Sequence, residues 1–189
     1  MAMPLTPTQW TAAQALALPD DDNRYEVLDG ELVVMPPPSW AHQIVVEQLH
    51  LALHHYVRAH ALGWVKFSPS GVVLSERRLV QPDVFVLPRG TGPAPRAWSD
   101  ITALLLAVEV LSPSTSRRDR WQKRRMYQEF GVSEYWVVDA EQRVVERWGP
   151  NDDAPVVCRD TLEWRPVGAS AALCIDLTHF FAVVNGEQE

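Results

Sequence analysis

Two acidic residues stand alone inside strongly apolar segments of this 189-residue chain. Asp83 lies in the segment QPDVFVL, and Glu109 lies in the segment LLLAVEVL. Lys123 follows on a predicted helix. Two carboxylates and a lysine delivered by neighbouring elements can bind a divalent cation and stabilise the negative charge that develops at a phosphate under attack. These residue types, in this order, predict metal-dependent cleavage of phosphodiester bonds.

The surroundings of the two acids are apolar. In an alternating strand, Asp83 shares a face with Phe85, and Glu109 shares a face with Ala107. A carboxylate among apolar neighbours must be protonated, paired or metal-bound, because an isolated buried charge is very costly. Two such carboxylates on adjacent strands can share Mg²⁺, a hard cation that prefers oxygen ligands, with Mn²⁺ as a substitute.

Lys123 lies on the helical face that also carries Met126 and Tyr127, so its stem is expected to point inward. An inward lysine needs an acid or a phosphate as its partner. It can orient the attacking water and stabilise the charge of the pentacovalent phosphate. Alternatively, Lys123 forms a structural ion pair with Asp83 or Glu109.

The elements that position these residues follow from hydrophobic periodicity and turn residues. The pair Asp29-Gly30 between two apolar segments is typical of a β-hairpin. Predicted helices span residues 8–18, 39–60, 117–130 and 177–183. Predicted strands span residues 24–28, 31–35, 65–67, 72–75, 83–87, 104–111, 134–139 and 143–148, with weaker strands beyond. The order implies a mixed sheet with helices packed on its faces, which is an α/β (α+β) fold. The segment 104–111, apolar except for Glu109, indicates a central strand covered on both sides. Ser39 can cap the second helix, Ser116 with Asp119 fits a capping box, and Gly131 fits the residue just past a helix end.

Pro82-Asp83 followed by Glu109 resembles the pattern of the PD-(D/E)XK superfamily of restriction-endonuclease-like nucleases. The resemblance to the Uma-two family of bacterial endonucleases is closer, because several motifs occur in the same order over about residues 24–148. These are RYEVLDGELVVM, Pro38 with His42, QPDVFV, VEVLSPST, Lys123 with Tyr127, and GVSEYWVVD.

This resemblance implies a restriction-endonuclease-like core, with a mixed central sheet flanked by helices and an N-terminal hairpin. It also implies Mg²⁺-dependent hydrolysis of DNA, with Asp83 and Glu109 as metal ligands. Glu26 matches the family's hairpin motif and is a candidate third acid; alternatively, it is a solvated hairpin residue. Leu111 stands where the superfamily usually has its lysine, and Lys123 on the next helix takes that place.

The segment RRDRWQKRR (117–125) is a candidate nucleic-acid contact. Arg117, Arg120 and Arg124 line one face of the predicted helix and can follow a phosphate backbone. The alternative is a solvated helix face or intermolecular ion pairs. Trp121 can stack on a base or pack at a subunit contact.

Two other chemistries are disfavoured. His50 and His54 have the spacing that can bind zinc on a helix, but the segment lacks the glutamate of zinc hydrolases, so a solvated face is favoured. Ser112 lacks the nucleophile elbow of serine hydrolases and fits a turn.

The length predicts a single domain over residues 1–189. The resemblance implies that it consists of an N-terminal helix and hairpin (1–38), a nuclease core (39–148) and C-terminal strands with a short helix (149–189). The net charge of −7 argues against a general nucleic-acid coat protein but leaves room for a local basic site. Cys158 and Cys174 are expected to be reduced thiols.

The chain has no long apolar segment and no secretory signal, so we expect a cytoplasmic protein without membrane contact. The expected partner is DNA. A homodimer is also expected, because two sites are needed to cut both strands of a duplex at once. The alternative function is a catalytically inactive nuclease-fold module that binds nucleic acid or dimerises.

Overall fold

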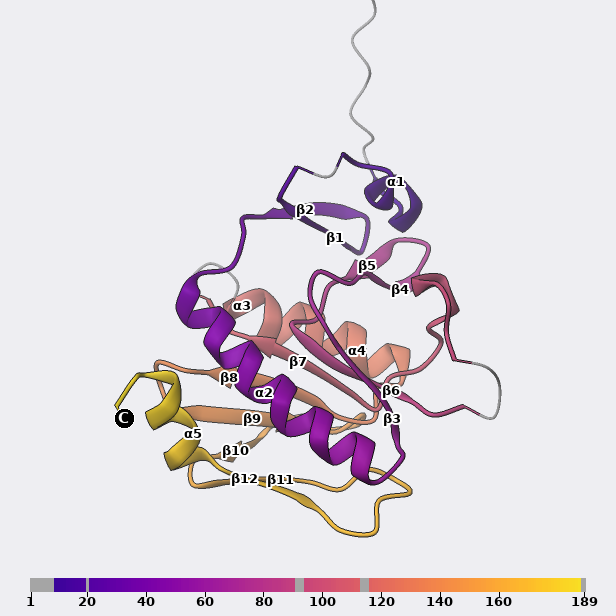
Figure 1. Cartoon of the computed structure of the whole chain (residues 1–189). Coiled ribbons are helices and arrows are strands. Elements are labelled where there is room, and N and C mark those ends of the chain that lie inside the picture. Colours follow the sequence, from indigo (N-terminus) through magenta and orange to yellow (C-terminus); the bar gives the residue numbers. More distant parts are fainter. Residues whose placement is uncertain (1–8, 20, 91–93, 113–115, 188–189) are drawn as a thin grey trace, which may run out of the picture.

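A computed structural model describes residues 9–19, 21–90, 94–112 and 116–187. Helices cover both faces of a mixed sheet, as the sequence predicted (Figure 1). The helical segments are α1 (Ala12–Leu16), α2 (Trp40–Ala59), the 3₁₀ turn η1 (Trp98–Asp100), α3 (Ser116–Arg118), the π-helical turn η2 (Asp119–Lys123), α4 (Arg124–Phe130) and α5 (Leu177–Val184). The strands are β1 (Arg24–Leu28), β2 (Glu31–Met35), β3 (Gly63–Phe67), β4 (Val72–Ser75), β5 (Arg78–Val80), β6 (Val84–Pro88), β7 (Leu106–Val110), β8 (Tyr135–Asp139), β9 (Val144–Trp148), β10 (Val156–Cys158), β11 (Thr161–Trp164) and β12 (Leu173–Asp176).

The largest sheet has the strand order β10-β9-β8-β7-β6-β3. Strands β7 and β8 are parallel, and the other neighbours are antiparallel. All five residues of β7 are buried. The prediction of a central strand covered on both sides is therefore confirmed, and its apolar run reflects that double covering.

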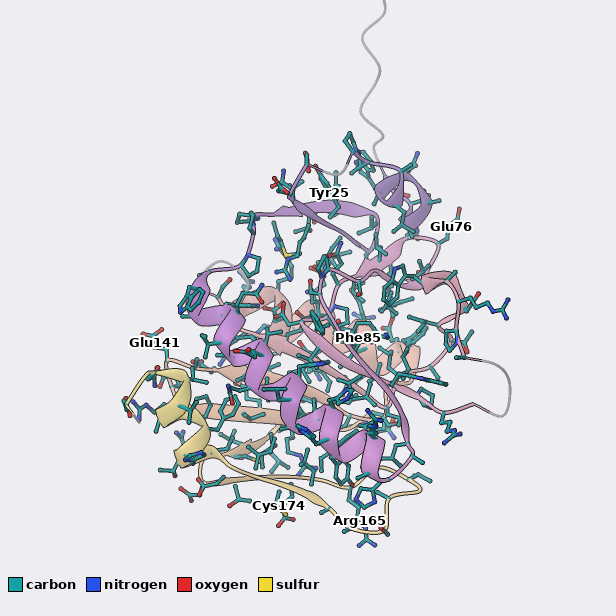
Figure 2. The ribbon with its side chains drawn as sticks, in the orientation of Figure 1. Tyr25, Glu76, Phe85, Glu141, Arg165 and Cys174 are labelled. Atoms are coloured by element: carbon teal, nitrogen blue, oxygen red, sulfur yellow. The ribbon has the colours of Figure 1, made fainter. Side chains whose placement is uncertain are left out.

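Two apolar cores lie on opposite faces of this sheet. The first joins α2 and α5 to the sheet through residues such as Leu53, Phe181 and Val108. The second joins α4 to the sheet through Tyr127 and Phe85. Figure 2 labels Phe85, a residue of β6, near the middle of the molecule. The second core is the one that surrounds the candidate site.

The N-terminal hairpin is confirmed and belongs to a second sheet with the order β2-β1-β5-β4. Asp29 (φ 52°) and Gly30 (φ 90°) both have left-handed backbones, as the tight hairpin turn requires. Along β1, Val27 packs in a small core with α1, whereas Leu28 belongs to the second core of the large sheet. Glu26 alternates with Val27 and so faces the large sheet.

The helix predicted over residues 117–130 is present, but it starts at Ser116 and contains the π-helical turn η2. Gly131 ends it with a left-handed backbone (φ 83°), as predicted. The expected capping box is wrong, because Ser116 is already helical and Asp119 is buried inside η2. Such π turns commonly occur at functional sites.

The N-terminal helix, the two cysteines and the absence of a membrane span can also be compared with the predictions. The helix predicted over 8–18 is shorter, because Thr11 and Gln14 form a capping box that starts α1 at Ala12. Cys158 and Cys174 are free thiols. Among the described residues, no helix has the length and apolar character needed to cross a membrane.

Candidate active site

Strands β6 and β7 bring Asp83 and Glu109 to the same end of the large sheet. Val84 pairs with Val108 in an antiparallel register, which places Asp83 opposite Glu109. The backbone N–H of Val110 donates a 2.9 Å hydrogen bond to Asp83 Oδ2. Both acids are almost fully buried, with exposed fractions of 2 % and 3 %. The two strands thus deliver the predicted acids side by side.

Lys123 reaches this pair from η2. Its Nζ lies 2.9 Å from Glu109 Oε1 and 3.7 Å from Asp119 Oδ1. The hydroxyl of Tyr127 donates a 2.7 Å hydrogen bond to the same Glu109 oxygen. All of these side chains are buried. The inward direction predicted for Lys123 is therefore observed. Asp119, which was predicted to take part in a helix cap, is instead a residue of the site.

Glu26 is the second partner of Lys123. Its Oε1 lies 2.8 Å from Lys123 Nζ and accepts a 2.7 Å hydrogen bond from the backbone N–H of Gln81. Its side chain is fully buried. The alternative of a solvated hairpin glutamate is thus wrong. A carboxylate from β1 and one from β7 hold the lysine between them.

Arg24 and His42 contact Asp83 from the opposite side. The Arg24 guanidinium donates 2.9 Å hydrogen bonds to Asp83 Oδ1 and to the hydroxyl of Ser68. His42 Nε2 lies 3.1 Å from Asp83 Oδ1. Sequence reasoning missed Arg24, although it precedes Glu26 by two residues in β1 and therefore shares its face.

These residues line a cavity of about 200 Å³. Its wall includes the side chains of both strand acids and of the basic residues around them, and exposed Pro36 and Pro37 form part of its rim. The residues that line it are Arg24, Met35, Pro36, Pro37, Pro38, Ser39, His42, Asp83, Glu109, Val110, Ser112, Asp119 and Lys123. Glu26 lies outside this set, because it sits behind Lys123.

Burial and the neighbouring charges together determine the pKa values of Glu109 and Lys123. Burial raises the pKa of Glu109 well above its ordinary value, and the nearby acids add to this, although Lys123 opposes it. Burial alone lowers the pKa of Lys123, but the three carboxylates around it outweigh burial and raise that pKa. Lys123 is therefore a cation at neutral pH.

Asp83 has the opposite balance. Burial raises its pKa, but the hydrogen bond and charge of His42 together with the charge of Arg24 outweigh burial and lower it below the ordinary range. Asp83 is therefore an ionised carboxylate at neutral pH. The two acids opposite each other on the sheet thus have pKa values that are shifted in opposite directions.

The donor set suits a hard divalent cation. Four buried carboxylates gather here against two permanent cations, and an excess of buried negative charge is costly until a proton or a metal neutralises it. The carboxylates belong to Glu26, Asp83, Glu109 and Asp119, and the cations are Arg24 and Lys123. Within the described residues, no three His, Cys, Asp or Glu side chains form a ready metal cage. Mg²⁺ commonly uses only one or two carboxylates and keeps water and substrate phosphate as its other ligands.

The three arginines predicted to contact nucleic acid have different surroundings. Arg117 is exposed. Arg120 pairs with Asp139 at 2.9 Å and with Glu146 at 2.7 Å. Arg124 lies over the ring of Trp148, with 4.6 Å between its Cζ and the ring centroid. Arg120 and Arg124 are thus held by groups of this chain.

The aromatic and imidazole candidates lie at the surface. Trp121 is 67 % exposed. The rings of His50 and His54 are 5.6 Å apart on α2. His54 is exposed, as expected for a solvated helix face, whereas His50 is half-buried. Ser112 lines the cavity beside the end of β7.

Comparisons with known proteins agree with this fold. The family model described as "Uma2: Putative restriction endonuclease" matches residues 12–171. A crystal structure described as that of a "putative nuclease belonging to DUF820", from Anabaena variabilis ATCC 29413, superposes with a TM-score of 0.78 at 18 % identity and covers 93 % of this chain and 99 % of that chain. No curated protein matches the chain. Because the family model spans most of its length, the chain belongs to the Uma2 (Uma-two) family.

Proposed function

We propose that this protein is a Mg²⁺-dependent endonuclease that hydrolyses phosphodiester bonds of DNA. Membership of a family described as restriction endonucleases supports a nuclease. The observation that carries the proposal is the juxtaposition of Asp83 and Glu109 on neighbouring strands, with Lys123 2.9 Å from Glu109 and all three on one cavity. A buried site with an excess of carboxylates favours a divalent cation, because the cation neutralises the buried negative charge.

In this proposal Asp83 and Glu109 hold Mg²⁺, and Mn²⁺ can replace it. When bound, the metal supplies Lewis-acid stabilisation and a more acidic water. Lys123 stays protonated because its pKa is raised, so it donates hydrogen bonds to the attacking water or to the phosphate and does not act as a base. Glu26 is a positioning residue, because its carboxylate holds the Lys123 ammonium at 2.8 Å.

The nucleic acid is proposed to enter along the rim of the cavity. Arg117, which is exposed at the start of the helix that carries Lys123, is the best placed of the three predicted arginines to contact a phosphate. Arg120 and Arg124 keep this helix against the sheet through their pairs within the chain. Their contact with DNA stays a prediction, as does the homodimer.

A cleavage assay on plasmid, single-stranded and branched DNA tests the proposal, with Mg²⁺ or Mn²⁺ supplied and with EDTA as the blank. Lys123→Arg keeps a cation and Lys123→Met removes it, so the Met variant is expected to lose most of the activity and the Arg variant less. Full activity of Lys123→Met would contradict the role given to the ammonium.

A binding module without catalysis is the second candidate function. It is favoured by the ion pairs that already satisfy both acids, Asp83 with Arg24 and Glu109 with Lys123. Binding of DNA with no cleavage under any of the metal conditions above would select this candidate. Cleavage that requires a divalent metal and Asp83 would exclude it.

A further inference from the structure

Basic and imidazole side chains form a stripe along α2 that begins at the candidate active site. His42 contacts Asp83 inside the cavity. His50, His54 and Arg58 follow at intervals of four residues, in a row that turns gradually round the helix because an α-helix has 3.6 residues per turn. The distance from residue 42 to residue 58 is about 24 Å, because an α-helix rises 1.5 Å per residue. The stripe therefore extends from the cavity end of α2 to its far end and turns round the helix as it does so.

The edge strand β3 runs beside this stripe. The exposed ring of Phe67 lies 4.7 Å from the ring of His50, so the strand and the helix meet midway along the stripe. Phe67 is opposite Val84, the residue next to Asp83, and Ser68 receives a hydrogen bond from Arg24. This end of β3 is therefore close to the active site.

A second cavity, of about 390 Å³, lies between α2 and β3 at the far end of the stripe. Four of its lining side chains are basic or imidazole groups, and all four are exposed: His54, Arg58, Lys66 and Arg89. We call this surface the basic groove. None of the residues that line it is acidic.

The charge of the basic groove is not neutralised locally. Among the described residues, Arg58, Lys66 and Arg89 make no ion pair with an acid of this chain. The only acid of α2 is the exposed Glu47. Burial and the neighbouring charges of His54 and Lys66 lower the pKa of His50, which agrees with a positive local potential. In a chain of net charge −7, a local concentration of free cations is unusual.

We propose that the basic groove binds the phosphate backbone of the nucleic acid that extends from the active-site cavity. The occupant follows from charge complementarity, because three cations without an ion pair line one groove and match a polyanion. A track of about 24 Å corresponds to about seven base pairs of duplex at 3.4 Å per step. The exposed ring of Phe67, midway along, can stack on an unpaired base.

This inference deepens the proposed function, because it names the surface that holds the substrate outside the cavity. It assigns binding without sequence readout, since phosphate contacts position a nucleic acid but do not read its bases. The proposed contacts lie away from the catalytic residues. Binding can therefore be measured with the metal removed.

The test uses the full chain and a fluorescently labelled duplex of about 20 base pairs, with a single strand of the same length, in EDTA. The groove variant carries Arg58→Gln, Lys66→Gln and Arg89→Gln. The matched control carries Arg77→Gln, Arg143→Gln and Arg159→Gln, which changes the net charge equally on other exposed surfaces. Anisotropy gives Kd at several salt concentrations, and circular dichroism verifies folding of both variants.

The groove variant is expected to bind about tenfold or more weakly near 0.1 M salt. Its slope of log K against log salt on duplex is expected to fall by about 2.7, which is the loss of three phosphate contacts. The control is expected to bind like the parent. Equal loss in both variants, an unchanged slope in the groove variant, or no binding by the parent would each overturn the inference.

Cleavage in Mg²⁺ is measured separately on the same proteins. If the parent cleaves and the groove variant binds and cleaves equally well, the inference fails and the proposed function stands. If the parent never cleaves but its binding depends on the basic groove, the inference stands and the proposed function fails.

Discussion

Lys123 Nζ lies 2.9 Å from Glu109 Oε1, although the two residues belong to different elements, η2 and β7. The lysine therefore reaches across from the helix to the acid of the strand. Leu111, two residues after Glu109, stands where the resemblance to the PD-(D/E)XK pattern implied a lysine. The π-helical turn that carries the lysine keeps both Asp119 and Lys123 buried.

We predict that the ion pairs of Lys123 are important for stability. Lys123→Ala leaves Glu26 and Glu109 buried without their cation and is expected to lower the free energy of unfolding by about 3–5 kcal/mol. Urea denaturation at neutral pH without metal measures this. Arg125→Ala, which removes the exposed pair with Glu129, is the control and should change stability little.

A second variant separates the lost charge pair from the lost volume. Glu26→Gln combined with Lys123→Met removes charges of both signs and is expected to recover part of the stability lost in Lys123→Ala. Equal stability of the parent and Lys123→Ala would show that the buried pairs contribute nothing.

The pH dependence of stability should report Glu109. Burial raises its pKa above the ordinary 4.5, so the folded state holds the proton more tightly than the unfolded chain. Its contribution to stability is therefore complete below pH 4.5 and is lost as the pH rises toward the folded pKa. In EDTA, Glu109→Gln should gain stability relative to the parent as the pH increases above 4.5. A pH-independent difference between the two proteins would contradict the raised pKa.

Mg²⁺ binding should compete with that proton. Because a ligating carboxylate must be ionised, binding is expected to release protons and to strengthen as the pH rises. At a free concentration of about 100 Kd, Mg²⁺ should stabilise the parent by about 2.7 kcal/mol. Thermal unfolding with and without Mg²⁺ measures this, and Asp83→Asn should lose most of the increase in Tm. The same increase in Tm in both proteins would place the metal elsewhere.

Gly63 is predicted to be essential for the pairing of β3 with β6. A Cβ at this position would lie 1.8 Å from the carbonyl oxygen of Leu87, which cannot move without breaking the sheet. Gly131→Ala is the control, because it has a left-handed backbone but nothing within 4 Å, and its expected cost is about 1–2 kcal/mol. Chemical denaturation should show a clearly larger loss for Gly63→Ala. Equal losses would mean that the strand end relaxes freely.

The sequence predicted the elements that carry strong local signals. The hairpin turn at Asp29-Gly30, the cap of α2 at Ser39 and the left-handed Gly131 are where local rules place them. The three-residue strand β5 was missed, because so short a segment has no detectable period.

In the site, sequence reasoning identified the residues that stand out against apolar neighbours, Asp83 and Glu109, and the lysine on an inward helical face. It missed Arg24 and Asp119, whose burial depends on the packing of the hairpin sheet and on the π turn. Local propensity contains no information on these contacts. The basic groove was missed for the same reason, since its residues come from three separate segments.

The most direct test of the account is metal-dependent cleavage of a supercoiled plasmid by the parent, by Asp83→Asn, and by Asp153→Asn as a control at an exposed carboxylate. We predict that the parent and Asp153→Asn nick or linearise the plasmid in Mg²⁺ but not in EDTA, and that Asp83→Asn is slower by about 100-fold or more. Cleavage that persists in EDTA, or an Asp83→Asn variant as fast as the parent, would contradict a metal-dependent site at Asp83 and Glu109.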